Sequence, residues 1–181
     1  IGVNDVVVVP EQEVPDGNFT TCPYPNPEIK EALAKGLELC EKEQPDLLLA
    51  TDPDADRVGI AVKDYDGSYR LISGNEDDVM LTNYILSCKK ASGKLPEKPV
   101  VVKTIVTTKL INKLCEKYGC ELKNVLTGFK YIGEVILNLE KKHEENRYLF
   151  GFEESYGYLS CTYVRDKDAV VASMLVCEMA A

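Results

Sequence analysis

LLLATDPDADRVGIAV, residues 47–62, consists of two apolar runs of strand length that flank three aspartates and an arginine. Asp52, Asp54 and Asp56 are spaced i, i+2, i+4, so in an extended or gently curved loop their carboxylates point the same way. Converging carboxylates repel unless a cation lies among them, and all-oxygen ligands suit Mg²⁺. Arg57 adds a planar fork that can bind an anion beside that metal. The segment predicts a metal site for phosphate chemistry.

Three alternative interpretations of this loop can be compared with the sequence. A calcium EF-hand needs Gly after the third acidic ligand and Glu at loop position twelve, but Arg57 and Lys63 occupy those places. A haloacid-dehalogenase-type phosphatase places a nucleophilic Asp after a buried strand, and Asp54 and Asp56 fit its Asp-x-Asp pattern. A simple acidic turn shaped by Pro53 is the third interpretation. The phosphatase and the acidic turn both remain open at this point.

The composition limits the possible partners. A net charge of −9 argues against binding to nucleic acid or to an anionic membrane surface, because both need a basic patch. No apolar run approaches the ~20 residues of a membrane span. Seven cysteines without a Cys-x-x-Cys pair, and a single histidine, argue against zinc and against a disulfide framework. We therefore expect a cytoplasmic protein whose cysteines are mostly small core residues.

Strand and helix signals alternate along the chain, which predicts an α/β fold with a mainly parallel or mixed sheet in each of two units. Gly74-Asn75 marks the predicted boundary between the units. The strands are expected at Asp5–Val9, Leu47–Ala50, Val58–Lys63, Tyr69–Ser73, Pro99–Ile105, Glu121–Leu126, Arg147–Phe152 and Tyr158–Val164. The helices are expected from Pro27 to about Glu43, from Glu76 to about Lys90, from the Thr107/Thr108 cap to Gly119, over Phe129–His143, and from Asp168 onward.

A second cluster, GFEESYGY at residues 151–158, lies between two predicted strands. Its glycines let the backbone turn sharply. Glu153 can accept hydrogen bonds from two neighbouring sugar hydroxyls, and Ser155 can donate or accept one. The segment is therefore a candidate sugar-binding loop, with an acidic hairpin turn as the alternative.

Four segments together resemble the α-D-phosphohexomutases, the phosphoglucomutase/phosphomannomutase family. The string TDPDADRVGIAV is similar to the magnesium loop of that family, and GFEESYG to its sugar-binding loop. TGFK at residues 127–130 resembles the Thr-Gly-aromatic-Lys segment, although Thr127 can also be a plain helix cap. VRDKDA at residues 164–169 resembles the Arg-acidic-Lys-Asp motif, although Lys167 can also belong to a solvated charge run.

The resemblance covers almost the whole chain and implies a fragment of a four-domain enzyme. It implies two similar three-layer α/β/α units with mixed sheets. Residues 1–73 would be the second domain without its first strand and helix, and residues 74–181 the third domain. Domains 1 and 4 of the same polypeptide, with the phosphoserine loop and a phosphate-binding loop, would then lie outside this chain.

The resemblance also implies an activity and site roles. The enzyme would be an isomerase, an intramolecular phosphotransferase acting on hexose or pentose phosphates through a phosphoserine and a sugar 1,6-bisphosphate. Mg²⁺ would bind Asp52, Asp54 and Asp56, and Arg57 would bind a phosphoryl oxygen. Glu153 and Ser155 would bind sugar hydroxyls, while Thr127 and Lys167 would bind the phosphate that is not reacting. The fragment alone is expected to be inactive, and a metal-dependent sugar-phosphate binding module without catalysis is an alternative.

Overall fold

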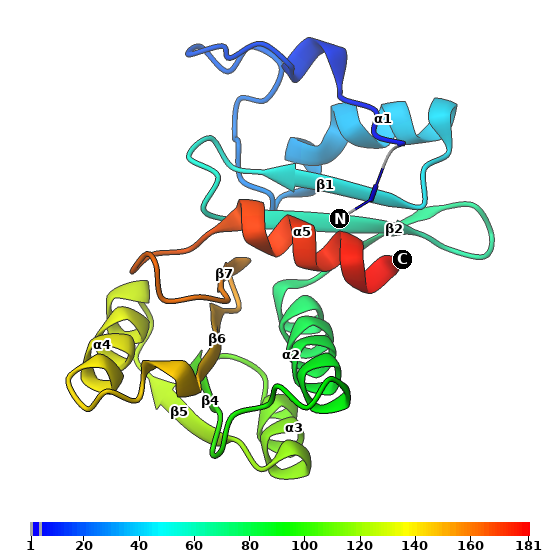
Figure 1. The fold of residues 1–181 in the computed structure, drawn as a ribbon. Helices are drawn as coiled ribbons and strands as arrows, with labels where there is room; N and C mark the ends of the chain where they lie inside the picture. Colours follow the sequence, from blue (N-terminus) through cyan, green and yellow to red (C-terminus); the bar gives the residue numbers. More distant parts are fainter. Residues whose placement is uncertain (1, 4) are drawn as a thin grey trace.

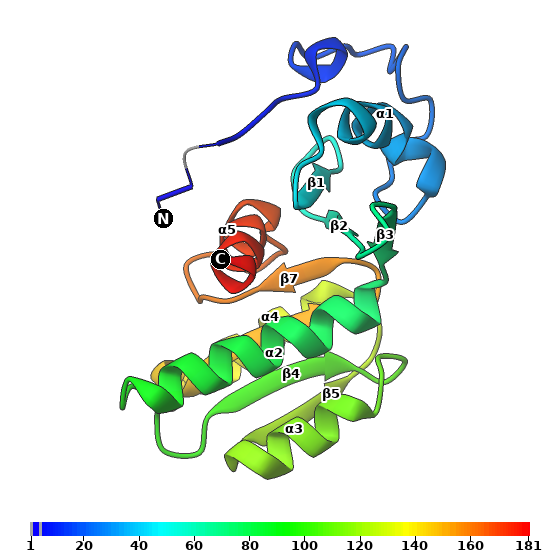
Figure 2. The ribbon, with the colours of Figure 1, turned by 90° about the vertical axis from the view of Figure 1, so that its right-hand side faces the viewer.

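The computed structural model describes residues 2–3 and 5–181, which form two β-sheets with helices packed on them (Figure 1). The first sheet contains β1 (Leu47–Thr51), β2 (Val58–Lys63) and β3 (Tyr69–Ile72), all antiparallel in the order β1-β2-β3. The helix α1 (Ala34–Glu43) packs on one face of this sheet, where Gly36 lies against Leu48. The C-terminal helix α5 (Ala169–Ala180) packs on the other face (Figure 2).

The second sheet has the order β5-β4-β6-β7 and is mixed. Strand β4 (Val100–Thr104) is parallel to β5 (Glu121–Val125) and β6 (Tyr148–Glu153), whereas β7 (Gly157–Leu159) is antiparallel to β6. Helices α2 (Gly74–Ala91) and α3 (Leu110–Tyr118) cover one face, and α4 (Phe129–Glu140) covers the other (Figure 1). Three short 3₁₀ segments complete the elements: η1 (Pro10–Gln12), η2 (Lys30–Leu33) and η3 (Glu145–Arg147).

The larger hydrophobic core passes from one sheet to the other without a break. It joins Ile60 of β2 and Val176 of α5 to Leu81 of α2 and to Phe150 and Tyr158 of the second sheet. A smaller core fills the space between the second sheet and α4. Because the loops that carry the candidate site leave this shared core, packing determines their relative positions. Among the described residues, no helix is both long enough and apolar enough to cross a membrane.

Most predicted elements are confirmed, including the α/β class and the three-layer arrangement, but several details differ. Asp5–Val9 was predicted to be a buried strand, and this prediction is wrong. The segment has no strand pairing, and Val6 and Val7 are 69% and 54% exposed. Apolar β-branched residues favour extended backbone, but a strand also needs a neighbour to accept its hydrogen bonds. The first sheet is antiparallel rather than mixed, and β7 ends at Leu159 rather than at Val164.

The start of α2 is fixed by two features. Ser73 and Glu76 form a capping box, in which the Ser73 hydroxyl accepts from the Glu76 N–H and the Glu76 carboxylate accepts from the Ser73 N–H. Gly74, the first helical residue, lies directly against the backbone of Glu154 in the β6–β7 loop. A Cβ at position 74 would lie 1.9 Å from the Glu154 carbonyl oxygen. The predicted boundary at residue 74 therefore coincides with a tight contact between α2 and the candidate sugar loop.

Replacing Gly74 by alanine tests this contact. At a solvent-exposed position inside a helix, replacing glycine by alanine would stabilise the protein by up to about 1 kcal/mol. Here we expect Gly74→Ala to lower the free energy of unfolding by about 1–3 kcal/mol, because the backbone of residue 154 must move. Urea denaturation monitored by circular dichroism measures the difference. The matched control is Gly17→Ala, since a Cβ at position 17 meets nothing within 4 Å. A Gly74→Ala chain as stable as the control would contradict the contact.

Candidate active site

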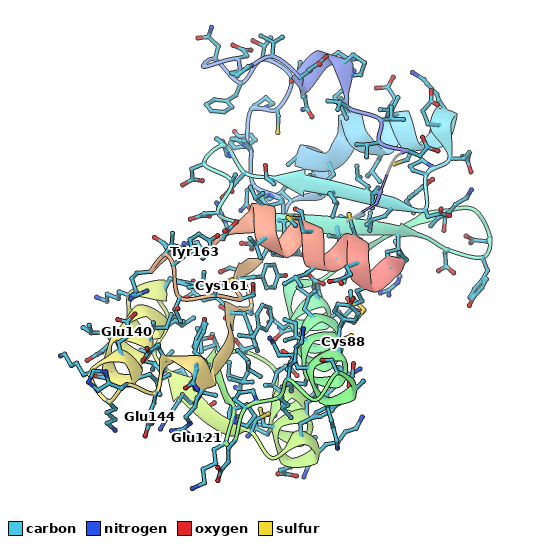
Figure 3. All side chains as sticks on the ribbon, in the orientation of Figure 1. Cys88, Glu121, Glu140, Glu144, Cys161 and Tyr163 are labelled. Atoms are coloured by element: carbon cyan, nitrogen blue, oxygen red, sulfur yellow. The ribbon has the colours of Figure 1, made fainter. Side chains whose placement is uncertain are left out.

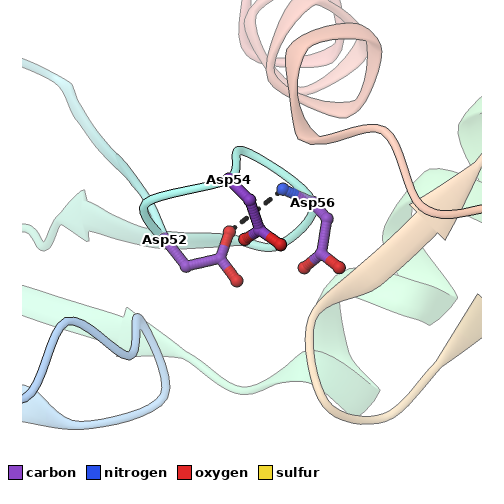
Figure 4. A group of neighbouring side chains, drawn as sticks. All are labelled: Asp52, Asp54 and Asp56. Carbon is purple, nitrogen blue, oxygen red and sulfur yellow. Dashed lines mark hydrogen bonds between the residues drawn. The ribbon is translucent and has the colours of Figure 1, made fainter.

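The three aspartates lie on the loop between β1 and β2, and their carboxylates face the same side (Figure 4). One oxygen from each lies within 4.8 Å of the others. The predicted convergence is present, but the loop is a tight turn rather than an extended segment. The Ala55 N–H donates to the Asp52 carbonyl at 3.0 Å, and Ala55 has a left-handed φ of 54°. The turn places Asp54 in solvent and Asp52 in the protein interior.

The carboxylate of Asp52 holds this turn together. Its Oδ1 accepts from the backbone N–H groups of Asp56 at 3.0 Å and Arg57 at 2.9 Å, and its Oδ2 accepts from Arg57 Nε at 2.7 Å. Burial by itself would raise the pKa of Asp52, but these hydrogen bonds from Arg57 hold it below its ordinary value. Arg57 is also oriented by Asn26 and Glu28, whose side-chain oxygens lie 3.4 Å from Nη1. No local sequence pattern connects Asn26 or Glu28 to Arg57.

Backbone hydrogen bonds join the aspartate loop to the candidate sugar-binding loop at residues 151–158. The Val58 N–H donates to the Tyr156 carbonyl at 3.2 Å, and Arg57 pairs with Gly157 in an isolated antiparallel bridge. The Ala169 N–H, at the start of α5, donates to the Ala55 carbonyl at 3.0 Å. Segments about a hundred residues apart in the sequence are thus connected through their main chains.

Lys167 enters the site from the segment that precedes α5. Its Nζ lies 2.8 Å from Asp56 Oδ2 and 2.9 Å from Asp166 Oδ1, and it lies over the Phe129 ring at 5.3 Å. Burial alone would lower the pKa of Lys167, but the bonds to Asp166 and Asp56 raise it, so the side chain is a cation. A Cβ on Gly157 would come within 2.2 Å of Lys167 Cδ, which explains a glycine at this position.

The adjacent carboxylates of Glu153 and Glu154 have different partners. Glu153 Oε1 accepts from the Gly128 N–H at 2.6 Å, at the first turn of α4. Glu154 Oε2 instead accepts from the hydroxyls of Thr104 at 2.8 Å and Thr107 at 3.3 Å. Only Glu153 therefore faces the aspartates.

A polar cavity of about 280 Å³ brings together seven of the eight residues predicted from the sequence. They are Asp52, Asp54, Asp56, Arg57, Glu153, Ser155 and Lys167. The eighth, Thr127, is exposed and does not line this cavity. It does not cap α4 either, because Gly128 precedes the first helical residue and no side chain caps that end. The backbone N–H of Gly128 is the contribution of this segment, and side-chain motifs alone do not reveal it.

The cavity can bind a cation and an anion together. Three carboxylates at the turn suit a hard divalent cation, and Arg57 and Lys167 provide positive charge beside it. Glu153 and Ser155 provide hydrogen-bonding groups on the opposite loop. A phosphorylated, hydroxyl-bearing ligand matches this set of groups.

Comparison with known proteins agrees with this chemistry. Two family models match: phosphoglucomutase/phosphomannomutase alpha/beta/alpha domain II over residues 1–67, and domain III over residues 75–181. The chain is 37% identical to a phosphomannomutase of Mycoplasmoides pirum over 99% of its length, and 40% identical to a phosphoribomutase of Saccharomyces cerevisiae over 94%. It spans 31% and 28% of those two relatives, about a third or less of each.

Solved structures show the same fold. One is a putative phosphomannomutase from Thermus thermophilus, with a TM-score of 0.63 and 28% identity, matched over 86% of this chain and 31% of that one. Another is an Aspergillus fumigatus N-acetylphosphoglucosamine mutase in complex with GlcNAc-6P and magnesium. It has a TM-score of 0.52 and 15% identity, matched over 79% of this chain and 36% of that one, and it shows the fold alone.

The family models together match nearly the whole chain. This chain belongs to the phosphoglucomutase/phosphomannomutase family.

Proposed function

We propose that this chain supplies the metal-binding and sugar-binding loops of a Mg²⁺-dependent phosphohexomutase, which interconverts sugar 1-phosphates and 6-phosphates. The observation that carries the proposal is the single cavity that combines three aspartates, Arg57, Lys167 and the Glu153–Ser155 loop. The phosphoserine and a further phosphate-binding loop would come from other parts of the parent polypeptide. Family membership favours this reaction over the phosphatase alternative and over a purely non-catalytic binding module.

The aspartates fit a magnesium ion. Their nearest oxygens lie within 4.8 Å of one another, so small side-chain rotations would bring them to a common ion. When bound, the ion would neutralise charge on the phosphorylated serine and on the transferring group. Asp52 is committed to Arg57 and the loop backbone, so it would bind the metal while also keeping the turn closed.

The basic residues would stabilise the transferring phosphoryl group. Phosphoryl transfer depends mainly on positioning and electrostatic stabilisation, because negative charge is spread over the equatorial oxygens. Asp52 fixes Arg57 through Nε, and Nη1 faces Asn26 and Glu28, which leaves Nη2 to bind a phosphoryl oxygen. Lys167 would leave Asp56 to bind the phosphate that is not reacting. Thr127 lies outside the cavity, so it would contact that phosphate only if other parts of the parent polypeptide changed the shape of the site.

Glu153 and Ser155 would hold the sugar. The Gly128 N–H occupies Glu153 Oε1, so the other carboxylate oxygen remains for hydroxyl groups. A sugar 1,6-bisphosphate must present either end to the same serine, so the same few groups must serve both orientations. A hexose 1,6-bisphosphate and a pentose 1,5-bisphosphate would both meet this requirement, and the names of the two relatives, a phosphomannomutase and a phosphoribomutase, span both classes.

Metal binding by the chain itself is the first test. We expect Mg²⁺ to bind weakly, with a Kd of about 1 mM, because Mg²⁺ prefers to keep several waters and three carboxylates do not complete its shell. Isothermal titration calorimetry measures it. Asp54→Asn should remove the binding without loss of stability, since Asp54 is exposed. Asp64→Asn, at the β2–β3 turn, is the control and should bind as the parent does. Calcium binding far tighter than magnesium binding would instead indicate a dedicated calcium loop.

Removing the cation that competes for Asp56 is a second test. Lys167→Met keeps an apolar stem beside Gly157 but removes the ammonium 2.8 Å from Asp56 Oδ2. We expect Mg²⁺ affinity to rise several-fold in this variant, because a like-charged neighbour no longer opposes the metal. Lys130→Met, on the adjacent helix and outside the cavity, serves as the control. Unchanged affinity in Lys167→Met would show that the lysine does not oppose the metal.

The sugar-loop role is tested in the full-length parent. Glu153→Gln can still accept from the Gly128 N–H but loses charge and one acceptor. Charged hydrogen bonds contribute about 1.5–3 kcal/mol each, so kcat/KM should fall by roughly 10- to 1,000-fold. Glu154→Gln is the contrasting variant, which should reduce thermal stability more than kcat/KM. Steady-state kinetics with glucose, mannose and ribose 1-phosphates, and melting curves, distinguish the two. A kcat/KM for Glu153→Gln equal to that of the wild type would contradict the proposed role of Glu153 in sugar binding.

A further inference from the structure

The turn between α3 and β5 has the geometry of a Schellman motif with a cysteine at each end. The Cys120 N–H donates to the Cys115 carbonyl at 2.9 Å, and the Gly119 N–H donates to the Glu116 carbonyl at 3.4 Å. Gly119 has a left-handed φ of 70°. These are the two hydrogen bonds that define the motif, with Cys115 at C3 and Cys120 at C″. Side chains at these two positions commonly contact each other.

The turn places both cysteines in the larger core. Cys115 is 3% exposed, and Cys120 is half-buried and packs against the same cluster. The neighbouring Cys115 thiol lowers the pKa of Cys120, although burial opposes the shift. The neighbouring Cys120, together with burial, raises the pKa of Cys115. The buried ammonium of Lys103 adds positive charge near Cys115.

The two cysteines therefore differ in solvent accessibility and in thiol acidity. Cys120 is the more accessible sulfur and the one that more readily becomes a thiolate, which is the nucleophilic form. Cys115 is enclosed and lies behind it. A partly accessible attacking thiol with a second thiol beside it is the arrangement of a redox-responsive pair.

We infer that Cys115 and Cys120 form a thiol-disulfide exchange site whose co-substrate is a low-molecular-weight disulfide. The Cys120 thiolate attacks one sulfur of the small disulfide, breaks its S–S bond and expels one small thiolate. Cys115, after losing its proton, attacks the Cys120 sulfur in the mixed disulfide. The Cys115–Cys120 bond forms, and the second small thiolate leaves. Two protein thiols are oxidised, one small disulfide is reduced to two thiols, and the two protons pass to the leaving groups.

The position of the pair gives the modification a direct structural effect. A bond between these two side chains would fix the α3–β5 turn covalently across Gly119. This bond would need little backbone movement, because the motif already brings the two residues together. The site is separate from the aspartate cavity, so neither metal nor substrate binding is needed for the reaction.

Peptide mapping of the 181-residue chain tests the inference directly. The chain is incubated under native conditions with oxidised glutathione, remaining thiols are alkylated in acid, and the product is digested with trypsin. Lys113, Lys117 and Lys123 place Cys115 and Cys120 in separate peptides, residues 114–117 and 118–123. We expect these two peptides to appear joined by a disulfide and to separate on reduction. Two peptides that remain unlinked at every glutathione concentration would overturn the inference.

Three variants identify the order of the steps. Cys115→Ser should stop the reaction at a glutathione adduct on Cys120, and Cys120→Ser should leave Cys115 unmodified. Cys88→Ser is the matched control, since Cys88 is an exposed cysteine on α2 (Figure 3), and its loss should leave the linked peptide unchanged. A glutathione adduct on Cys115 in Cys120→Ser would show that the assigned order is wrong. The wild-type map decides the main question even if a serine variant unfolds.

Discussion

The site depends first on the buried carboxylate of Asp52. This carboxylate lies at the end of β1 and accepts from two N–H groups of its own loop and from Arg57 Nε. The loop closes around it, and this closure turns Asp54 and Asp56 toward one side. A carboxylate buried this deeply would be costly without such partners. One interaction thereby provides the turn, the orientation of the arginine and the clustering of the acidic ligands.

Charge balance in the site follows from this arrangement. Three carboxylates would repel one another, but Arg57 and Lys167 each contact a member of the cluster. Lys167 comes from a segment more than a hundred residues later, and main-chain hydrogen bonds from Val58 and Ala169 maintain that proximity. The negative charge of the cluster is therefore only partly offset, by residues that are also suited to phosphate. A divalent metal would offset the remaining negative charge, and a phosphorylated ligand would compete for the two cations.

The sequence was sufficient for the element order and for most site residues, because apolar runs, loop spacing and charged residues encode both. It was not sufficient where the structure of a segment depends on contacts with residues that are distant in the sequence. Asp5–Val9 looks like a strand but pairs with nothing in the described chain, and Thr127 lies outside the cavity although its segment contributes the Gly128 N–H. The different partners of Glu153 and Glu154 depend on Thr104, Thr107 and Gly128, which no local pattern connects to them. The proximity of Cys115 and Cys120 depends on the backbone hydrogen bonds of the turn between α3 and β5.

The placement of α5 has a consequence for how the chain unfolds. This helix follows the second sheet in sequence but covers one face of the first, with Ala172 and Val176 in the core that both sheets share. A chain divided after Ser73 would separate β1 and β2 from the helix that shields them. Local opening at either end of the chain would therefore expose apolar surface in the other half. We therefore expect the two sheets of this chain to unfold as one cooperative unit rather than as modules connected by a hinge.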